Sequence, residues 1–480
     1  PGSVKEWHKT KRVQLMESKG RCRREKQQWL KKVKDEKVLG VVRELNIPFI
    51  VKLMREAGMK EVTIQFMQKV FTEGAEYITD VDITGLYDRV PKEKEYGNYE
   101  FQAPTVLKKL YDVNTTVISD RQVRVPDKYT DKIYQYTQQE VDTRTEGSLP
   151  YQTLIGPIGS LQELPDDVLY PAFRFWVPQS TATGADEGRT VDDLTASGGN
   201  CQTCIKEKLA LPSLDDFVAM CRQVAQMFPE NQWGPQLFSK QDMRKAFRQV
   251  PGCPHSRQWG AFAVRNPDTQ LIELFQHLSL PFGARAAPLL FCAVARILCE
   301  LAAFQLGVPI VAFVDDFFAV VPSSISDTGF NQFKWFVIDL LGFHLKTEKE
   351  SPPKSAGMLL GIWVNLLPGG NGEFFLPDDK RLKYLSKVQA VLNDDVLTSG
   401  NAAKLAGALS FASSVTLARF GRPFLQPLYG LASGRIYRVD EEAEYVPPQG
   451  KRGEKGLHPR VRWALLWLSL IHISEPTRPY

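Results

Sequence analysis

Two adjacent aspartates, Asp315 and Asp316, interrupt an apolar stretch that runs from Pro309 to Val321. Burying an uncompensated carboxylate costs free energy, so an acidic pair in such a segment calls for a positive charge nearby. The flanking residues have strand composition, which predicts a β-hairpin that carries both acids at its turn. Asp is also an ordinary turn residue, so the pair alone does not distinguish a plain turn from a cation site.

A third acid stands seventy-three positions earlier (315 minus 242). Asp242 follows a short strand-like segment that starts at Gln236, and a brief helical turn stopped by Pro251 comes next, which places Asp242 at a strand end. Between the acids, residues 280–291 form a Pro/Gly-bounded turn that leads into a long apolar helix ending near Gly307. Carboxylates from separate strands can converge on hard cations such as Mg2+, which share oxygen ligands with phosphates. This order of motifs therefore predicts a metal site.

Five motifs in this order and spacing resemble the palm motifs of retroelement reverse transcriptases. They are Asp242 with Phe247, the Pro281-Phe282-Gly283 turn, the Phe313-Val314-Asp315-Asp316 box, Lys349, and the Leu360-Gly361 step. The resemblance covers roughly residues 170–430 and favours the Pro-Phe-Gly type of retrotransposons over the retroviral enzymes. It implies an α+β right-hand polymerase fold of fingers, palm and thumb, in which an antiparallel palm sheet packs on helices after a mostly helical N-terminal region.

The resemblance also implies an RNA-directed DNA polymerase with a two-metal mechanism. Asp242, Asp315 and Asp316 would hold two Mg2+ ions, with Mn2+ as the substitute, and Met243 would add a backbone carbonyl. Adjacent residues of a strand point to opposite faces, so Asp316 should point differently from Asp315. The implied partners are an RNA or DNA template with its primer and deoxynucleoside triphosphates.

Besides Met243, four residues stand at the nucleotide-binding positions of this family. Phe247 resembles the aromatic gate that excludes a 2′-hydroxyl; its alternative is a core aromatic residue. Phe282 stands where retroviral enzymes carry a glutamine, so only the turn and Gly283 transfer. Arg189 matches the fingers arginine that reaches the triphosphate, and a surface ion pair with a neighbouring aspartate is its alternative.

The remaining matches concern the leaving group and the primer. Lys349 matches the lysine that protonates or neutralises pyrophosphate, with Lys346 as a competing candidate. Leu360 and Gly361 resemble the primer grip, and a tight bend is the simpler interpretation. Phe313 replaces the more usual Tyr, which removes a hydroxyl near the primer but leaves every metal ligand in place.

The chain divides into five expected segments: a basic, partly helical region of unassigned role (1–150), fingers and palm (151–367), a thumb-like helical region (368–445), the start of a truncated downstream region (446–467), and a stretch that resembles a translated sequencing-library adapter (468–480). The formal net charge is only +5. The segment from Lys5 to Lys37, however, contains thirteen Lys and Arg residues but only five Asp and Glu residues. Such an arm suits a phosphate backbone, and a solvated helix face explains it equally well.

Seven cysteines, an odd and scattered set, indicate a reducing intracellular compartment, and no secretion signal is visible. Cys201 and Cys204 lack two further ligands at zinc spacing, so we predict no zinc site. Arg296 and Glu300 lie within the long apolar segment and favour a buried core helix over a membrane span.

The sequence leaves the oligomeric state open. It also leaves two alternative functions: a catalytically inactive nucleic-acid-binding relic, and an RNA-templated RNA polymerase, which the bulk of Phe247 disfavours.

Overall fold

The computed structural model describes residues 2–91, 116, 120, 127–145, 147–160, 171–180, 186–416, 421–434 and 456–469. The chain forms two compact units, which are described separately: residues 1–212, 239–319 and 327–352 make the first unit, and residues 213–238, 320–326 and 353–480 make the second. Helices and sheets are both present, which confirms the expected α+β class. Most of the adapter-like stretch, residues 470–480, lies outside the described residues.

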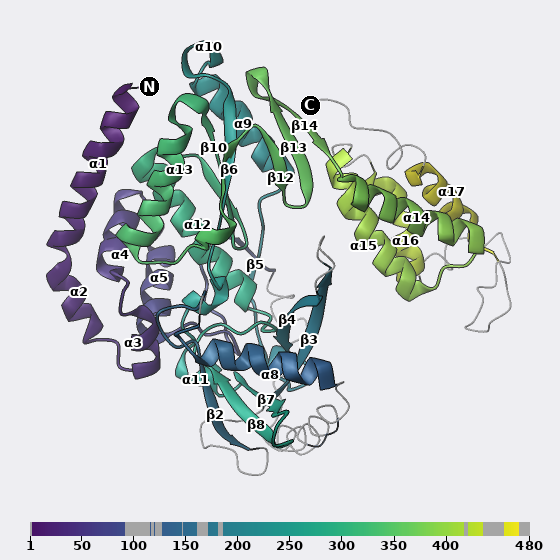
Figure 1. Cartoon of the computed structure of the whole chain (residues 1–480), viewed down its shortest axis with the longest axis horizontal. Helices are drawn as coiled ribbons and strands as arrows, with labels where there is room; N and C mark the ends of the chain where they lie inside the picture. The colour runs from purple at the N-terminus through teal and green to yellow at the C-terminus, as the bar shows by residue number, and fades with distance from the viewer. Residues whose placement is uncertain are drawn as a thin grey trace. The chain divides into compact units, whose positions relative to one another are not determined.

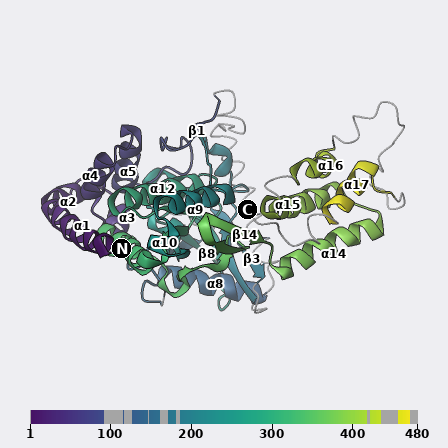
Figure 2. The ribbon, with the colours of Figure 1, turned by 90° about the horizontal axis from the view of Figure 1, so that it is seen from above.

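The N-terminal region forms a layer of helices on one side of the first unit (Figures 1 and 2). The helices are α1 (Gly2–Arg21), α2 (Arg23–Leu30), α3 (Glu36–Val42), α4 (Ile47–Glu56) and α5 (Glu61–Glu73). Asp35 and Asn46 cap α3 and α4 by accepting hydrogen bonds from backbone N–H groups. The imidazole of His8 in α1 bonds to the carbonyl of Leu306 at 2.8 Å. The basic arm is therefore a docked helical layer with many of its Lys and Arg side chains exposed.

A five-stranded sheet forms the other side of the first unit. Its order is β2 (Leu154–Ser160), β8 (Ile272–His277), β7 (Ala261–Arg265), β3 (Ala172–Ser180) and β4 (Asp186–Asp192). Strands β7 and β8 pair as an antiparallel hairpin, and β3 pairs with β7 in parallel. Helix α8 (Asp127–Val141) packs on this sheet.

The acidic motifs lie on a four-stranded sheet of order β11 (Ser351–Lys354), β6 (Gln236–Asp242), β10 (Asp316–Pro322) and β9 (Ile310–Phe313). Strand β10 is buried after its first residue, and α12 (Ala287–Leu306) packs on β9. Among the described helices, α12 alone is long and apolar enough to cross a membrane, and most of it is buried inside the protein. Its charged residues Arg296 and Glu300 are exposed and pair with each other at 2.9 Å.

The second unit combines a small sheet with a helical bundle. Strands β12 (Ala356–Leu359), β13 (Ile362–Leu367) and β14 (Asn371–Phe375) form an antiparallel sheet. Helix α9 (Leu214–Met227) packs on β14. Leucine-rich faces of α14 (Asp378–Asp394), α15 (Ser399–Thr416), α16 (Arg422–Ala432) and α17 (Pro459–Trp467) share one apolar cluster. Leu468, the first residue of the adapter-like stretch, is buried in that cluster.

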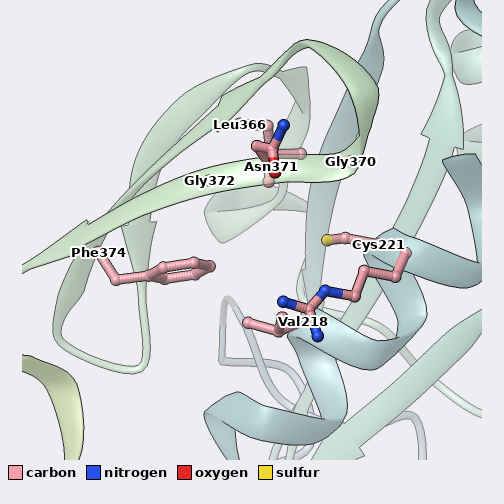
Figure 3. A pocket seen from close by; sticks show the side chains of 8 residues that line it. Val218, Cys221, Leu366, Gly370, Asn371, Gly372 and Phe374 are labelled. Carbon is pink, nitrogen blue, oxygen red and sulfur yellow. The ribbon is translucent and has the colours of Figure 1, made fainter. Parts of the chain in front are cut away.

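A pocket lies between α9 and the β13–β14 hairpin (Figure 3). Val218 and Cys221 of α9 line it together with Phe374 and the glycines of the hairpin. Burial raises the pKa of Cys221 to about 12, which leaves the thiol protonated and unreactive. We assign no chemistry to this pocket.

The turn between β12 and β13 is strained. Leu359 pairs with Ile362, so the loop consists of Leu360 and Gly361 alone. Both have positive φ, 50° and 78° respectively. A two-residue hairpin turn with two positive φ values favours Asn-Gly, whereas a leucine in this region clashes with its own backbone.

Replacing Leu360 with Asn is therefore expected to stabilise the second unit by about 1 kcal/mol, because Asn tolerates the left-handed conformation. Denaturant unfolding measures the change. Leu367→Asn is the control, since Leu367 is a half-buried strand residue of the same sheet with an ordinary φ of −109°, and it should lower the stability. Equal losses in both variants would show that Leu360 contributes packing and not strain.

Candidate active site

The acidic pair sits on a two-residue hairpin turn, as the sequence predicts. Phe313 pairs with Asp316, so Val314 and Asp315 form the turn between β9 and β10. Val314 has a φ of 56°, and a β-branched residue at positive φ is a true outlier. Strain of this kind persists only where the surrounding structure imposes it, and it concentrates at functional sites.

Backbone hydrogen bonds attach Asp242 to this turn. Asp242 is the last residue of β6, which lies beside β10 in the sheet. The N–H of Met243 donates to the carbonyl of Asp315 at 2.9 Å, and the N–H of Lys346 donates to the carbonyl of Asp242 at 2.7 Å. The structure thus brings Asp242, Asp315 and Asp316 to adjacent strand ends, and all three are half-buried.

The three carboxylates repel one another electrostatically. Burial and then the charges of Asp315 and Asp316 raise the pKa of Asp242 to about 6. Burial and then Asp316 also raise the pKa of Asp315, while Lys240 and Arg189 oppose the rise. Carboxylates that raise each other's pKa are stabilised in their charged form by an added cation.

One of the acids already has a positively charged partner. Lys240, two residues before Asp242 on β6, places its Nζ 2.7 Å from Oδ1 of Asp316. No group of three or more His, Cys, Asp or Glu side chains in the described part of the chain is arranged to hold a metal ion alone. Asp242 and Asp315 therefore fit a cation that takes few protein ligands and completes its shell with water and phosphate oxygens, which is the behaviour of Mg2+.

The loop after Asp242 is locked by a buried amide. The side-chain NH2 of Gln249 donates to the carbonyls of Arg244 and His344 at 2.7 and 2.8 Å, and its oxygen accepts from the N–H of His344 at 2.9 Å. These three bonds fix the chain on the C-terminal side of the acidic strand end.

Next to the acids, aromatic side chains form a cluster. Phe247, on the short helix η2 (Ala246–Gln249), packs against Phe282 and Phe291 with ring centroids 5.0 and 5.4 Å apart. Phe247 is 8% exposed. Phe247 is thus as buried as a core aromatic residue would be. Phe282, which packs on it, is half-buried, and the next residue, Gly283, is exposed at the surface.

Gly283 allows the Pro-Phe-Gly turn to lie against the end of β4. Its φ is 112°, and a Cβ there would approach the carbonyl oxygen of Asp192 to 2.0 Å. The N–H of Asp192 donates to the carbonyl of Phe282 at 3.1 Å. Asn200 closes the turn from the other side, since its amide donates to the carbonyl of Gly283 at 2.9 Å and its oxygen accepts from the N–H of Arg285 at 2.8 Å.

A buried ionic network lies behind this turn. Arg174 binds both carboxylate oxygens of Asp192, at 2.7 and 3.0 Å, and Arg248 binds those of Glu140, at 3.1 and 3.3 Å. His277 joins the two pairs: Nδ1 faces the guanidinium of Arg248 at 2.8 Å, and Nε2 lies 2.7 Å from Asp192. A guanidinium only donates, so Nδ1 accepts and Nε2–H donates to Asp192.

The network is balanced in charge. Burial and then the nearby Arg248 lower the pKa of His277 to about 4, although Asp192 opposes the shift. Burial alone would raise the pKa of Glu140, but Arg248 and Arg174 outweigh it and hold that pKa at about 2. Two guanidiniums thus face two carboxylates across a neutral imidazole.

The other sequence candidates differ in their exposure and in whether their charges act on the acids. Arg189 is exposed on β4, and its charge acts on Asp315, while Asp192 is buried with Arg174 instead of pairing at the surface. Lys349 is exposed on a short 3-10 turn, whereas Lys346 acts on the pKa of Asp242. Leu360 and Gly361 belong to the second unit.

Sequence reasoning missed five residues that organise the site. They are Asp192 in its buried role, Asn200, Lys240, Arg248 and Gln249. Lys240 had a usable signal, because residues two apart on a strand share a face. The other contacts join segments far apart in the chain, and no local pattern predicts them.

Comparison with known proteins agrees with this geometry. Residues 201–349 match the family model described as reverse transcriptase (RNA-dependent DNA polymerase). This segment of the chain is therefore similar to reverse transcriptases, and it holds Asp242, Asp315 and Asp316. No curated protein sequence matches the chain.

Two solved structures are among those that match part of the chain. A foamy viral protease-reverse transcriptase dRH in complex with ds DNA has 15% identity and a TM-score of 0.43, and the match covers 66% of this chain and 45% of that one. A foamy viral protease-reverse transcriptase in complex with RNA/DNA hybrid has 15% identity and a TM-score of 0.41, with coverage of 68% and 35%. The chain spans less than half the length of either structure.

We expect acid to destabilise the first unit through His277. Its ordinary pKa is 6.5, and its pKa in the folded unit is about 4. Between these values the unfolded chain binds a proton that the folded unit does not, so the free energy of unfolding falls as the pH drops. Each unit of pKa difference is worth about 1.4 kcal/mol, which makes the loss a few kcal/mol.

Urea unfolding through this pH range measures the effect. The His277→Gln variant lacks the titrating ring and should show a lower stability near neutral pH but a shallower dependence on pH. The control is His255→Gln, at an exposed histidine outside the network, which should keep the wild-type slope. An unchanged slope in His277→Gln would contradict the assignment.

Proposed function

We propose that this chain is an RNA-directed DNA polymerase of a retrotransposon, which adds deoxynucleotides to a primer 3′-hydroxyl on an RNA or DNA template with the help of two Mg2+ ions. The observation that carries the proposal is the junction of β6 with the β9–β10 turn. There Asp242 and Asp315 lie at adjacent strand ends, joined by the 2.9 Å bond from the N–H of Met243 to the carbonyl of Asp315, and the charge of Asp315 raises the pKa of Asp242. The Pro-Phe-Gly turn and the Phe313-Val314-Asp315-Asp316 box favour the retrotransposon type.

The acids would hold the metal ions. Asp242 and Asp315 supply the oxygen ligands, and their mutual repulsion favours a bound divalent cation over the bare site. Two bound metal ions stabilise the charge on the attacking and leaving oxygens of a phosphoryl transfer. Asp316 is paired with Lys240, which makes it the weaker ligand of the three and leaves Lys240 to balance its charge.

Other residues would position the substrates. Phe247 packs against Phe282, and its ring would form the floor of the sugar site, where a 2′-hydroxyl would clash. Gly283 leaves its backbone exposed beside this floor. Arg189, whose charge acts on Asp315, suits the triphosphate. Lys346 is as well placed as Lys349 to neutralise pyrophosphate, because its charge acts on Asp242.

Primer extension tests the metal role of Asp315. With Mg2+, a template and deoxynucleotides, the wild-type chain should extend the primer, whereas Asp315→Asn should lose extension by a factor of at least about 100, because it removes ligand charge. Template binding should stay nearly unchanged, since no basic residue is altered.

The control variant is Asp327→Asn, an exposed acid of the same unit on α13 (Ser326–Trp335), which should extend normally. Extension by Asp315→Asn at the wild-type rate would reject the two-metal assignment. Template binding by a wild-type chain that extends no primer would favour the inactive relic.

The sugar preference tests Phe247. Replacing Phe247 with Ala should open space for a 2′-hydroxyl and raise ribonucleotide use relative to deoxynucleotide use by roughly tenfold to two-hundredfold, the range of steric selection worth about 1–3 kcal/mol. Single-nucleotide incorporation rates for the two sugars on one primer-template give the ratio.

A core phenylalanine elsewhere in the unit supplies the control. Phe71→Ala, on α5, removes a fully buried ring that packs on Phe343 and should lower stability without changing the sugar ratio. A fixed ratio in a folded Phe247→Ala variant would make Phe247 a core residue only. Equal wild-type use of both sugars would revive the RNA polymerase alternative.

A further inference from the structure

Arg248 is a fully buried cation directly after the proposed gate residue. It is 1% exposed and follows Phe247 on η2. Beyond its bonds to Glu140 and His277, its guanidinium donates to the carbonyl of Leu280 at 3.0 Å, immediately before the Pro-Phe-Gly turn. It also lies over the ring of Phe282, with 5.5 Å to the centroid. Arg248 therefore links η2, which carries Phe247, to the Pro-Phe-Gly turn. These two segments form the proposed floor of the sugar site.

The contacts continue from Arg248 to the other side of the turn. His277 accepts from Arg248 and donates to Asp192. Asp192 in turn donates its N–H to the carbonyl of Phe282 and lies against Gly283. A chain of short polar contacts thus runs from the residue after the gate to the backbone of the turn that faces it.

We infer that Arg248 is a positioning residue for nucleotide selection, and that through His277 and Asp192 it holds the Phe247 ring against the Phe282-Gly283 turn. The inference rests on the proposed polymerase function. Arg248 does not touch the reacting atoms in this scheme. Its role is to set the position of a steric wall, where a small displacement changes which sugar fits.

The choice of arginine follows from its geometry. Its planar fork binds both oxygens of Glu140 while a third N–H group serves His277 and Leu280. A lysine offers one compact ammonium at this point and cannot span these acceptors. Arg248→Lys therefore keeps the charge of the network and removes its geometry.

Single-nucleotide incorporation by Arg248→Lys tests the inference. We expect the preference for deoxynucleotides over ribonucleotides to fall about threefold to tenfold, with a higher KM for the deoxynucleotide and a smaller change in kcat. In a Phe247→Ala background the same substitution should have little further effect on the preference, because the wall that it positions is already gone.

The matched control is Arg257→Lys. Arg257 is also buried and binds both oxygens of a carboxylate, Asp35, at 2.7 and 3.0 Å. That variant should lose comparable stability and keep the wild-type sugar preference. Equal shifts in both variants, or a full effect of Arg248→Lys in the Phe247→Ala background, would overturn the inference and leave Arg248 a structural residue.

Hydrogen exchange separates this inference from the polymerase function. Without any substrate, amide exchange in residues 280–286 should be faster in Arg248→Lys than in the wild type and unchanged in Arg257→Lys. An inactive wild-type chain with this exchange pattern would reject the polymerase function while the positioning contact stands. An unchanged exchange rate in Arg248→Lys would reject the positioning contact in an active enzyme.

Discussion

The repulsion between carboxylates at the junction of β6 and the β9–β10 turn governs the first unit. Asp242 and Asp315 are held half-buried although burial and a neighbouring carboxylate raise the pKa of each. Within the described part of the chain, Asp316 alone of the three forms an ion pair, with Lys240. The strained turn at Val314 leads into β10, which is buried after its first residue, and the largely buried α12 packs on β9, the strand before the turn. A surplus of negative charge at one place favours the binding of a cation there.

The second electrostatic centre has the opposite character. Arg174 and Arg248 offset Asp192 and Glu140, and His277 stays neutral between them. A buried network in which every member is satisfied contributes rigidity, whereas removing one partner leaves an unpaired buried charge. The first unit thus combines an acidic centre that carries surplus negative charge with a buried network whose charges balance. The Phe247–Phe282 contact adjoins the network, because Arg248 follows Phe247 and lies over the ring of Phe282.

Local patterns were sufficient for the elements that carry the acids. The strand end at Asp242, the hairpin at Asp315 and Asp316, and the apolar helix that ends before Gly307 all follow from composition and turn residues within a few positions. Boundaries between compact units were beyond such patterns. The chain passes between the units at five places, two of which lie inside β6 and β10, and no Gly/Pro-rich linker marks those two.

The sequence by itself indicated which residues form the candidate site, because the acids, the aromatic gate candidate and the glycine turn match reverse-transcriptase motifs in residue type, order and spacing. Tertiary structure alone decided how these groups are supported. His277 meets Asp192 across 85 positions and Arg248 meets Glu140 across 108 positions. Such contacts depend on how the strands and α8 pack. The neighbouring residues in the sequence do not predict that packing.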